Sequence, residues 1–460
     1  MSRQKRPHKI YVRHVTGYFR QLRIISGGFL LLLFFSGVWL RIGGQPLILF
    51  DLPGRKFHLF GTIFWPQDFI LLSFILIICA CGLFTITALF GRIWCGYACP
   101  QSVFSGLFLW AERVTEGSRH RRIKQDQQPL TVPVFARKTA KHLIWLILSI
   151  ATALTFVGYF VPVNRLLAQW VKLDIYQWSY LWVGFFTVAT YLNAGWLREK
   201  ICLHMCPYAR FQSVMLDNQT LVVSYDEKRG EPRHKTNHRS RLIPIHQQPS
   251  GDCIDCTLCV QVCPTGIDIR KGLQYECLSC GACIDACNQV MKKRRRPENL
   301  IGYRHQDIQQ DHKIQWFRPK VIGYGCVLLI MTGILITTLL TKKPLHAYLT
   351  HDPAVLYRVN DDGLITNTYQ LKIINTYHEP IIAHIELPDS QRFTLKSPVS
   401  FTLQEGEVLE QPVVVAESFP QQLPAVTSVQ FIIRTETLSK HPVNKDIKKE
   451  SRFLSPVTDP

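Results

Sequence analysis

No cysteine follows Cys326 in this chain of 460 residues, so disulfides cannot staple its C-terminal part. Acidic residues are also scarce beside basic ones, and the net charge is +20. The basic residues lie mainly in segments that flank apolar runs, which indicates membrane topology rather than nucleic-acid binding. No small-residue cleavage site follows the first apolar run, because Arg41 and the pair Gly43-Gly44 come next. We therefore interpret this run as a retained anchor.

Five apolar stretches are long enough to cross a bilayer as helices, which takes about 20 residues. They run approximately over Ile24–Leu40, Asp68–Phe90, His142–Val161, Trp178–Trp196 and Val321–Leu340. The alternative, that one of them is a buried core helix, would move the C-terminal tail to the other side of the membrane. Five spans predict a multi-pass protein of a bacterial inner membrane.

The distribution of lysine and arginine predicts the orientation. The arm 1–23 has seven, and the loops 91–141 and 197–320 have nine and twenty. The loops 41–67 and 162–177 have three and two. The N-terminus and both large basic loops are therefore expected in the cytoplasm, and the tail in the periplasm.

These features predict a multi-domain membrane protein with five transmembrane α-helices. The expected segments are a basic cytoplasmic arm (1–23), a four-helix region (24–196), a cytoplasmic loop (197–320) with a ferredoxin-like α+β insertion (about 244–300), a fifth helix (321–341) and a periplasmic domain (342–460). The last segment changes to period-two patterning, as in Tyr369, Leu371 and Ile373. Several short strands of this kind predict an immunoglobulin-like β-sandwich, which carries no recognisable catalytic set and is expected to be a docking module.

The strongest motif is Cys253-x2-Cys256-x2-Cys259-x3-Cys263-Pro264, followed by Cys277-x2-Cys280-x2-Cys283-x3-Cys287. This repeated spacing is typical of a bacterial ferredoxin with two [4Fe–4S] clusters, in which the fourth cysteine of each run binds the other cluster. One expected ligand set is Cys253, Cys256, Cys259 and Cys287. The other is Cys277, Cys280, Cys283 and Cys263. A zinc site would need only four of these thiolates and longer separations between pairs.

Local residues support the same interpretation. The fourth cysteine of each run is expected to begin a helix. Gly266 and Gly281 are expected to let the backbone approach closely, so that amide groups reach the cluster sulfurs. The second run has Asn288 where the first has Pro264, which removes no ligand.

Two further motifs repeat each other: Cys95-Gly-Tyr-Ala-Cys99-Pro100 and Cys202-Leu-His-Met-Cys206-Pro207. Each follows the cytoplasmic end of a predicted span, so four thiolates are expected to converge on one ion or cluster. Cysteine with the neighbouring Met205 is a soft donor set suited to Cu(I). The alternative is that these are structural thiols at helix ends, and the spacing does not decide the type of metal. Cys79, Cys81 and Cys326 are expected to be buried, inert thiols.

The chain resembles the cbb3-type cytochrome c oxidase accessory proteins known as CcoG, FixG or RdxA, a family of membrane polyferredoxins. The resemblance rests on Trp94–Gln101, Cys202–Gln212, Tyr225-Asp226 with Arg229–Arg233, Cys253–Asp268, Gly272–Cys277 and Ala282–Cys287. It implies reduction of Cu(II) to Cu(I) for the oxidase copper centre, with copper held by Cys95, Cys99, Cys202 and Cys206. It also implies copper transporters and oxidase assembly factors as partners.

Two other functions stay open. The first is a quinol-linked electron-transfer subunit for another reductase, although that class usually lacks the exported sandwich. The second is a non-enzymatic redox sensor or assembly scaffold. The sequence identifies neither the electron donor, the cluster potentials nor the oligomeric state.

Overall fold

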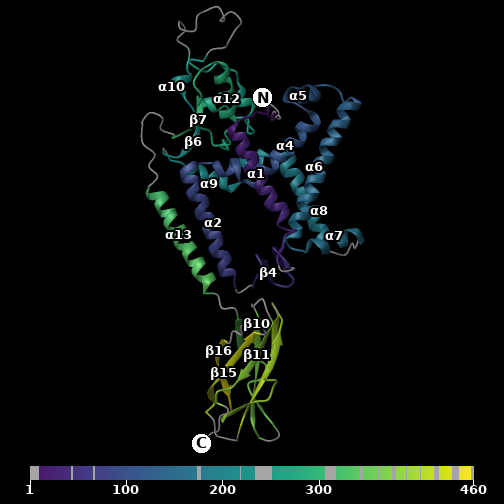
Figure 1. Ribbon diagram of the computed structural model, residues 1–460, viewed down its shortest axis with the longest axis vertical. Coiled ribbons are helices and arrows are strands. Elements are labelled where there is room, and N and C mark those ends of the chain that lie inside the picture. The colour runs from purple at the N-terminus through teal and green to yellow at the C-terminus, as the bar shows by residue number, and fades with distance from the viewer. Residues whose placement is uncertain are drawn as a thin grey trace, which may run out of the picture. The chain divides into compact units, whose positions relative to one another are not determined.

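The computed structural model describes residues 10–42, 45–65, 68–172, 178–217, 219–233, 251–305, 318–341, 345–360, 363–375, 380–389, 391–404, 406–418, 424–437 and 445–456. Parts of the expected N-terminal arm (1–9) and of the cytoplasmic loop (234–250 and 306–317) lie outside these residues, as does the expected beginning of the ferredoxin segment near residue 244. The chain forms two compact units, 1–336 and 337–460, which are described separately (Figure 1).

Apolar helices dominate the first unit. Among the described residues, four helices are long and apolar enough to cross a membrane: α1 (Tyr18–Ser36), α2 (Phe69–Phe90), α6 (Val132–Gly158) and α13 (Pro319–Leu340). The fourth predicted span coincides with α8 (Trp178–Thr190) and the π-helix η2 (Tyr191–Leu197) that continues it. α8 packs beside α6 (Figure 1). The chain is thus a membrane protein, and the count of five spans stays a prediction.

Short helices lie between the long ones. They are α3 (Ile93–Tyr97), α4 (Pro100–Glu116), α5 (Arg119–Gln127), α7 (Val163–Lys172), the π-helix η3 (Ile201–Met205) and α9 (Pro207–Met215). Glu112 of α4 is buried and forms ion pairs with Arg122 and Arg198, and Glu116 pairs with Lys141 of α6 at 2.9 Å. Because buried carboxylates are costly without a counter-charge, these pairs fix α4 against α5, α6 and the end of η2.

Two small sheets lie between α1 and α2. One pairs β1 (Arg41–Ile42) with β2 (Gln45–Pro46), and the other contains β3 (Ile48–Asp51), β4 (Lys56–Leu59) and β5 (Thr62–Phe64) in that order. The Phe50 amide donates to the carbonyl of Tyr159 just after α6, at 2.7 Å. The connection between the first two spanning helices is therefore attached to the end of the third, opposite the end where α3, α4 and α9 lie (Figure 1).

The cysteine-rich part of the first unit is a small α+β fold. Antiparallel strands β6 (Leu221–Tyr225) and β7 (Ile301–His305) close it, with Val223 opposite Tyr303. Between them lie α10 (Glu227–Gly230), α11 (Leu258–Gln261), the 3₁₀ turn η6 (Ile269–Lys271) and α12 (Ala282–Lys293). Its core combines residues from both strands with Ile284 and Met291 of α12 and with the cysteines themselves. The strand pair thus joins residues on either side of the predicted 244–300 segment.

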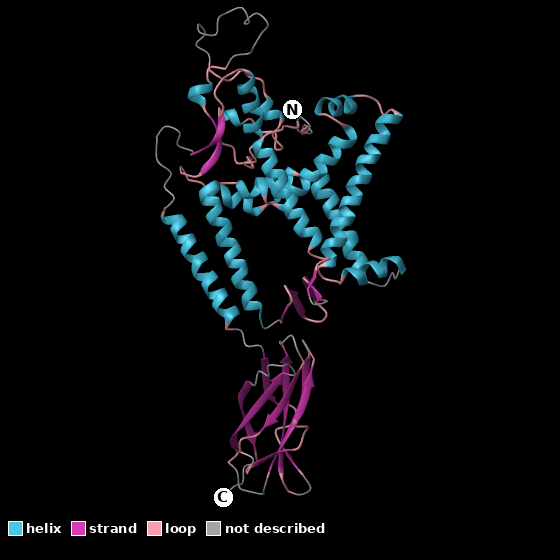
Figure 2. Cartoon of the chain, viewed as in Figure 1, coloured by secondary structure: helices cyan, strands magenta, loops and turns pink. Residues whose placement is uncertain are grey.

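The second unit is a β-sandwich (Figure 2). One sheet has the order β12-β14-β10-β8, with β9 paired to β10, and the other has the order β13-β11-β15-β16. The strands are β8 (Leu345–His351), β9 (Arg358–Val359), β10 (Ile365–Asn375), β11 (Ile381–Glu386), β12 (Phe393–Leu395), β13 (Ser400–Leu403), β14 (Val408–Glu417), β15 (Val426–Thr437) and β16 (Lys445–Leu454). Tyr369, Leu371 and Ile373 lie in its core, as the period-two pattern predicts.

Two sequence expectations are wrong. Cys79 of α2 and Cys326 of α13 are exposed rather than buried, and Cys81 is half-buried. Both helices are apolar almost all round, so their sequences do not show which face packs against protein. The expectation that the fourth cysteine of each run begins a helix is also wrong. Cys263 follows α11 and begins no helix, and Cys287 lies inside α12, which begins at Ala282.

Candidate iron–sulfur and cysteine-pair sites

The first expected ligand set lines one cavity. Cys253, Cys256, Cys259 and Cys287 surround it together with apolar side chains of Leu258, Val290, Met291, Leu300 and Ile301. Cys253 comes from the loop before α11 and Cys259 from α11 itself, whereas Cys287 comes from α12. The first run of cysteines therefore meets the last cysteine of the second run.

The second expected set lines a neighbouring cavity. Cys263, Cys277, Cys280 and Cys283 surround this one, and Cys259 also contributes to its wall. A shared wall means that two clusters held here would be close neighbours. No histidine, aspartate or glutamate lines either cavity among the described residues, and the cysteine sulfurs are the principal metal-binding atoms in both. Soft donors of this kind suit iron–sulfur clusters.

The two cysteine loops share one backbone conformation. In the first loop Asp255 and Thr257 have positive φ angles of 48° and 56°. In the second, Ser279 and Gly281 occupy the same places in the spacing, with φ of 48° and 70°. Left-handed residues at these two places turn neighbouring backbone amides toward a common centre, which favours an anionic guest.

Backbone amides also reach the cysteine sulfurs. Thr265 and Ile267 donate to Cys263, on either side of Gly266 with its φ of 72°. The Ser279 amide lies 3.4 Å from the sulfur of Cys277. Such N–H···S contacts stabilise negative charge on cluster ligands and tune the reduction potential. The donors and the backbone together fit [4Fe–4S] clusters.

Burial makes these thiols poor acids without a metal. It raises the pKa of Cys259, Cys277 and Cys287 to about 12. Cationic irons would reverse this by stabilising the thiolates. No three histidine, cysteine or acidic side chains within the described part of the chain lie close enough to hold a single metal ion.

The two CxxxCP motifs are built alike. Cys95 lies in α3 and Cys202 in η3, and the second cysteine of each motif precedes a helix that begins with proline. Cys99 and Cys206 have extended backbones, with φ/ψ of −62°/126° and −76°/113°. Each therefore sits at the N-terminus of a helix, where the helix dipole favours negative charge.

The four cysteines of these motifs lie near one another, although no three of them are close enough in this structure to hold a single metal ion. Burial raises the pKa of Cys95 to about 12, and the nearby Cys99, Cys202 and Cys206 add to the effect while Arg92 opposes it. Burial likewise raises the pKa of Cys202 to about 11. The neighbouring His204 and Met205 are exposed.

Gln212 of α9 links the two motifs. It is fully buried, and its Oε1 lies 3.6 Å from the sulfur of Cys95. Its amide nitrogen donates to the carbonyl of Gly91 at 2.9 Å. In addition, Arg92 donates to the carbonyl of Ala209 in α9. Sequence reasoning missed this bridge, because glutamine carries no motif signal of its own.

The first motif packs directly on the loop of the second expected cluster. A Cβ added to Gly96 would lie 2.8 Å from the carbonyl oxygen of Leu278 and 3.1 Å from the Cα of Cys280. Cys95 and Cys280 belong to one buried core, against which Cys202 and Cys283 also pack. The four-cysteine site and the second cluster site are therefore adjacent.

Helix α1 is attached to the cysteine-rich fold. The buried carboxylate of Asp285 in α12 accepts hydrogen bonds from the amides of Phe19 and Arg20, at 3.3 and 2.8 Å. The Phe19 ring covers Gly281, where an added Cβ would lie 2.6 Å from it. This cap joins the start of the first membrane helix to the second cysteine loop.

Comparisons with known proteins agree with this architecture. Residues 197–306 match a 4Fe-4S dicluster domain, residues 72–123 match a 4Fe-4S binding domain, and residues 335–456 match the IG-like fold at the C-terminus of FixG. The chain is 34% identical to the nitrogen fixation protein FixG of Rhizobium meliloti over 408 residues, covering 81% of this chain and 77% of that protein.

Two proteins of Cereibacter sphaeroides are similar at the same level. RdxA is 36% identical, covering 80% of this chain and 79% of its own length, and RdxB is 36% identical, covering 80% of each. A crystal structure of a FixG-related protein from Vibrio parahaemolyticus is 25% identical, covers 25% of this chain and 100% of its own, and has a TM-score of 0.22.

The fold, the cysteine sites and the matching domains define a membrane-bound polyferredoxin, an iron–sulfur electron-transfer protein. This class combines ferredoxin-type cysteine loops with apolar helices in one chain. The chain belongs to the FixG/RdxA family, as the resemblance in its sequence predicts.

Proposed function

We propose that this protein reduces Cu(II) to Cu(I) during assembly of a cbb3-type cytochrome c oxidase. The observation that supports it is the shared core of Cys95, Cys202, Cys280 and Cys283, which makes the CxxxCP site and the second cluster site neighbours. Electrons on the ferredoxin loops would then have a short path to a metal held by the CxxxCP cysteines.

The ligand sets are those that line the cavities. Cys253, Cys256, Cys259 and Cys287 hold one [4Fe–4S] cluster, and Cys263, Cys277, Cys280 and Cys283 hold the other. Each cluster, when reduced, supplies one electron, and reduction of one Cu(II) ion consumes one. The thiolates of Cys95, Cys99, Cys202 and Cys206 would bind the copper substrate by moving closer together than they lie in this structure, and would favour its Cu(I) state, because sulfur is a soft donor.

The orientation in the membrane is part of the proposal. The start of α1 is capped by Asp285, and Thr87 near the end of α2 bonds to Tyr208 at 2.6 Å. The start of α13 is held by an ion pair between Arg318 and Asp217. Successive spans thus present alternate ends to the cysteine-rich side, as a multi-pass chain must. The lysine and arginine content of the loops supports a cytoplasmic position for that side and a periplasmic one for the sandwich.

One observation favours a second candidate. The 4Fe-4S binding domain matched at 72–123 contains Cys95 and Cys99. If the CxxxCP cysteines hold a third cluster instead of copper, the protein is an electron-transfer subunit, linked to quinol or to another reductase. A redox sensor or scaffold would share the same centres and carry out no turnover.

Reoxidation by Cu(II) separates these functions. Anaerobically purified protein is reduced, mixed with Cu(II) in a stopped-flow instrument, and followed by cluster absorbance and by a Cu(I)-specific chelator. A variant with serine at Cys95, Cys99, Cys202 and Cys206 is expected to lose rapid reoxidation and Cu(I) release. Cys79→Ser with Cys326→Ser, which changes two exposed thiols, is the matched control and should behave as the parent. If the four-serine variant is reoxidised by Cu(II) as fast as the parent protein, those cysteines do not bind the copper substrate.

Partners follow from the same proposal. A copper-importing transporter, a copper-exporting P-type ATPase and oxidase assembly factors would supply or receive the metal. The electron donor is unidentified, and the C-terminal sandwich serves as the docking module.

A further inference from the structure

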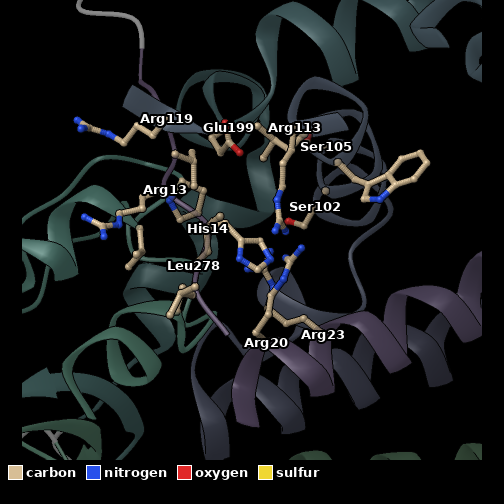
Figure 3. Close-up of a pocket in the computed structure, with 18 of the residues that line it drawn as sticks. Arg13, His14, Arg20, Arg23, Ser102, Ser105, Arg113, Arg119, Glu199 and Leu278 are labelled. Atoms are coloured by element: carbon tan, nitrogen blue, oxygen red, sulfur yellow. The ribbon is translucent and has the colours of Figure 1, made fainter. Parts of the chain in front are cut away.

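A cavity of about 400 Å³ lies beside the cysteine sites (Figure 3). Its walls come from the segment Val12–Val15, the first turns of α1, helix α4, the start of α5 and the ferredoxin loops. Cys202 lines it, as do Leu278 and Ala282, which directly neighbour Cys277 and Cys283. The volume is within the range of small-molecule sites. Apart from Cys202, none of the cysteines in the copper proposal lines this cavity.

The charge around the cavity is strongly positive. Its basic lining residues are Arg13, His14, Arg20, Arg23, Arg113, Arg119, His120 and Arg122. Glu199 is the one acidic residue among the described side chains that line it. Figure 3 shows His14, Arg20, Arg23 and Arg113 directed toward the same space.

Several of these cations have structural partners, and others do not. Arg122 is paired with Glu112, Arg119 donates to the carbonyl of Tyr11, and Arg23 donates to the carbonyl of Gly96. In contrast, the Nε of Arg20 is buried without a hydrogen-bond partner. The side chain of Arg113 has no hydrogen bond or ion pair with the described residues, and it raises the electrostatic cost of charge on His14.

Arg20 and Arg113 lie close to each other beside His14. Burial lowers the pKa of His14, and the nearby Arg113 and Arg20 lower it further, so the three groups lie close enough to interact. The half-buried Arg20 and the exposed Arg113 repel each other, and an anion bound between them would relieve this repulsion. A copper ion is unsuited to this space, since its own positive charge would be repelled.

The other residues that line the cavity indicate what kind of ligand it suits. Leu109, Trp110 and Val262 supply apolar and aromatic surface, and Ser102 and Ser105 supply hydroxyl groups. Two guanidinium groups near a histidine match the charge and the several acceptor oxygens of a phosphate better than those of a single carboxylate.

We propose that this cavity binds a phosphate-bearing small molecule, with its phosphate held by Arg20 and Arg113 beside His14. The same chemistry is offered by a soluble phosphate compound such as a nucleotide and by an anionic phospholipid headgroup, since α1 runs from the cavity into the membrane. In either case the ligand lies against both Cys202 and the loop of the second cluster.

Pyrophosphate binding tests the site. Full-length protein with its clusters, in nanodiscs of phosphatidylcholine, is titrated with inorganic pyrophosphate by calorimetry. Arg20→Gln and Arg113→Gln are each expected to weaken binding about tenfold or more, the usual effect of losing a charge-assisted contact. Arg121→Gln removes the same charge from an exposed position on α5 outside the cavity and should stay within about twofold. Iron content reports whether each variant is folded, and Arg113 is exposed on α4, so its replacement carries the test even if Arg20→Gln is unstable.

A second arm distinguishes the sources. Native mass spectrometry of protein from nanodiscs containing phosphatidylglycerol counts retained lipid. If the protein retains this lipid, if Arg113→Gln abolishes the retention, and if the lipid weakens pyrophosphate binding, the ligand is the phospholipid headgroup. If the lipid does not affect pyrophosphate binding, the ligand is a soluble phosphate compound. No pyrophosphate binding and no Arg113-dependent lipid retention would overturn the proposal, and neither result depends on whether the four CxxxCP cysteines hold copper.

Discussion

Replacing Gly96 with alanine perturbs the contact between the first CxxxCP motif and the loop of the second cluster. The new Cβ would lie 2.8 Å from the Leu278 carbonyl oxygen and 3.1 Å from the Cα of Cys280. Both atoms belong to backbone, so no flexible side chain can move aside and the loop itself must shift. Overpacking of this kind costs about 1–3 kcal/mol. We expect Gly96→Ala to reduce the free energy of unfolding of the cysteine-rich fold by that amount.

Chemical denaturation followed by cluster absorbance measures the effect in purified, reduced protein. Gly28→Ala is the matched control, because a Cβ at that position in α1 meets nothing within 4 Å. It should cause no loss of stability, since alanine is the better helix former. Gly96→Ala should also slow reoxidation by Cu(II), because the shift separates the two sites. Unchanged stability together with an unchanged rate would refute the direct packing of the motif on the loop.

Three further predictions concern the same region. Asp285→Asn weakens the cap on α1 and should reduce the free energy of unfolding by about 0.5–2 kcal/mol in chemical denaturation; no loss would mean that the cap is dispensable. Gly281→Ala should release iron from the second site faster than Gly272→Ala, because both have positive φ but only Gly281 is covered by Phe19; equal iron release would count against that contact. Removing the clusters with a chelator should increase hydrogen exchange in β6 and β7, whose core includes cysteines, and leave the separate sandwich core protected. Faster exchange in both units would contradict their independence.

Local spacing determines how much of this architecture the sequence predicts. The eight ferredoxin cysteines and the two CxxxCP motifs are recognisable because their ligands follow one another at short, fixed intervals. The structure places each expected quartet around its own cavity. The period-two strands of the tail are recognisable for the same reason, since burial alternates along each strand.

Contacts between distant segments were not predictable. The sequence does not distinguish Gly96 from other glycines, because its special position depends on contact with the distant Leu278. Nor does it show that Asp285 accepts a hydrogen bond from the first turn of α1. The basic cavity combines residues from 12 to 282, so no local pattern reveals it. The exposed position of Cys79 was missed because a uniformly apolar helix does not show which side faces protein.

Iron and acid-labile sulfide analysis of anaerobically purified protein, with Mössbauer spectra of the same sample, tests the central claim most directly. Two [4Fe–4S] clusters on the eight ferredoxin cysteines predict about eight iron and eight sulfide ions per chain. About twelve of each, lowered to eight by serine at Cys95, Cys99, Cys202 and Cys206, would show a third cluster in place of the copper site. Protein without inorganic sulfide would contradict the account.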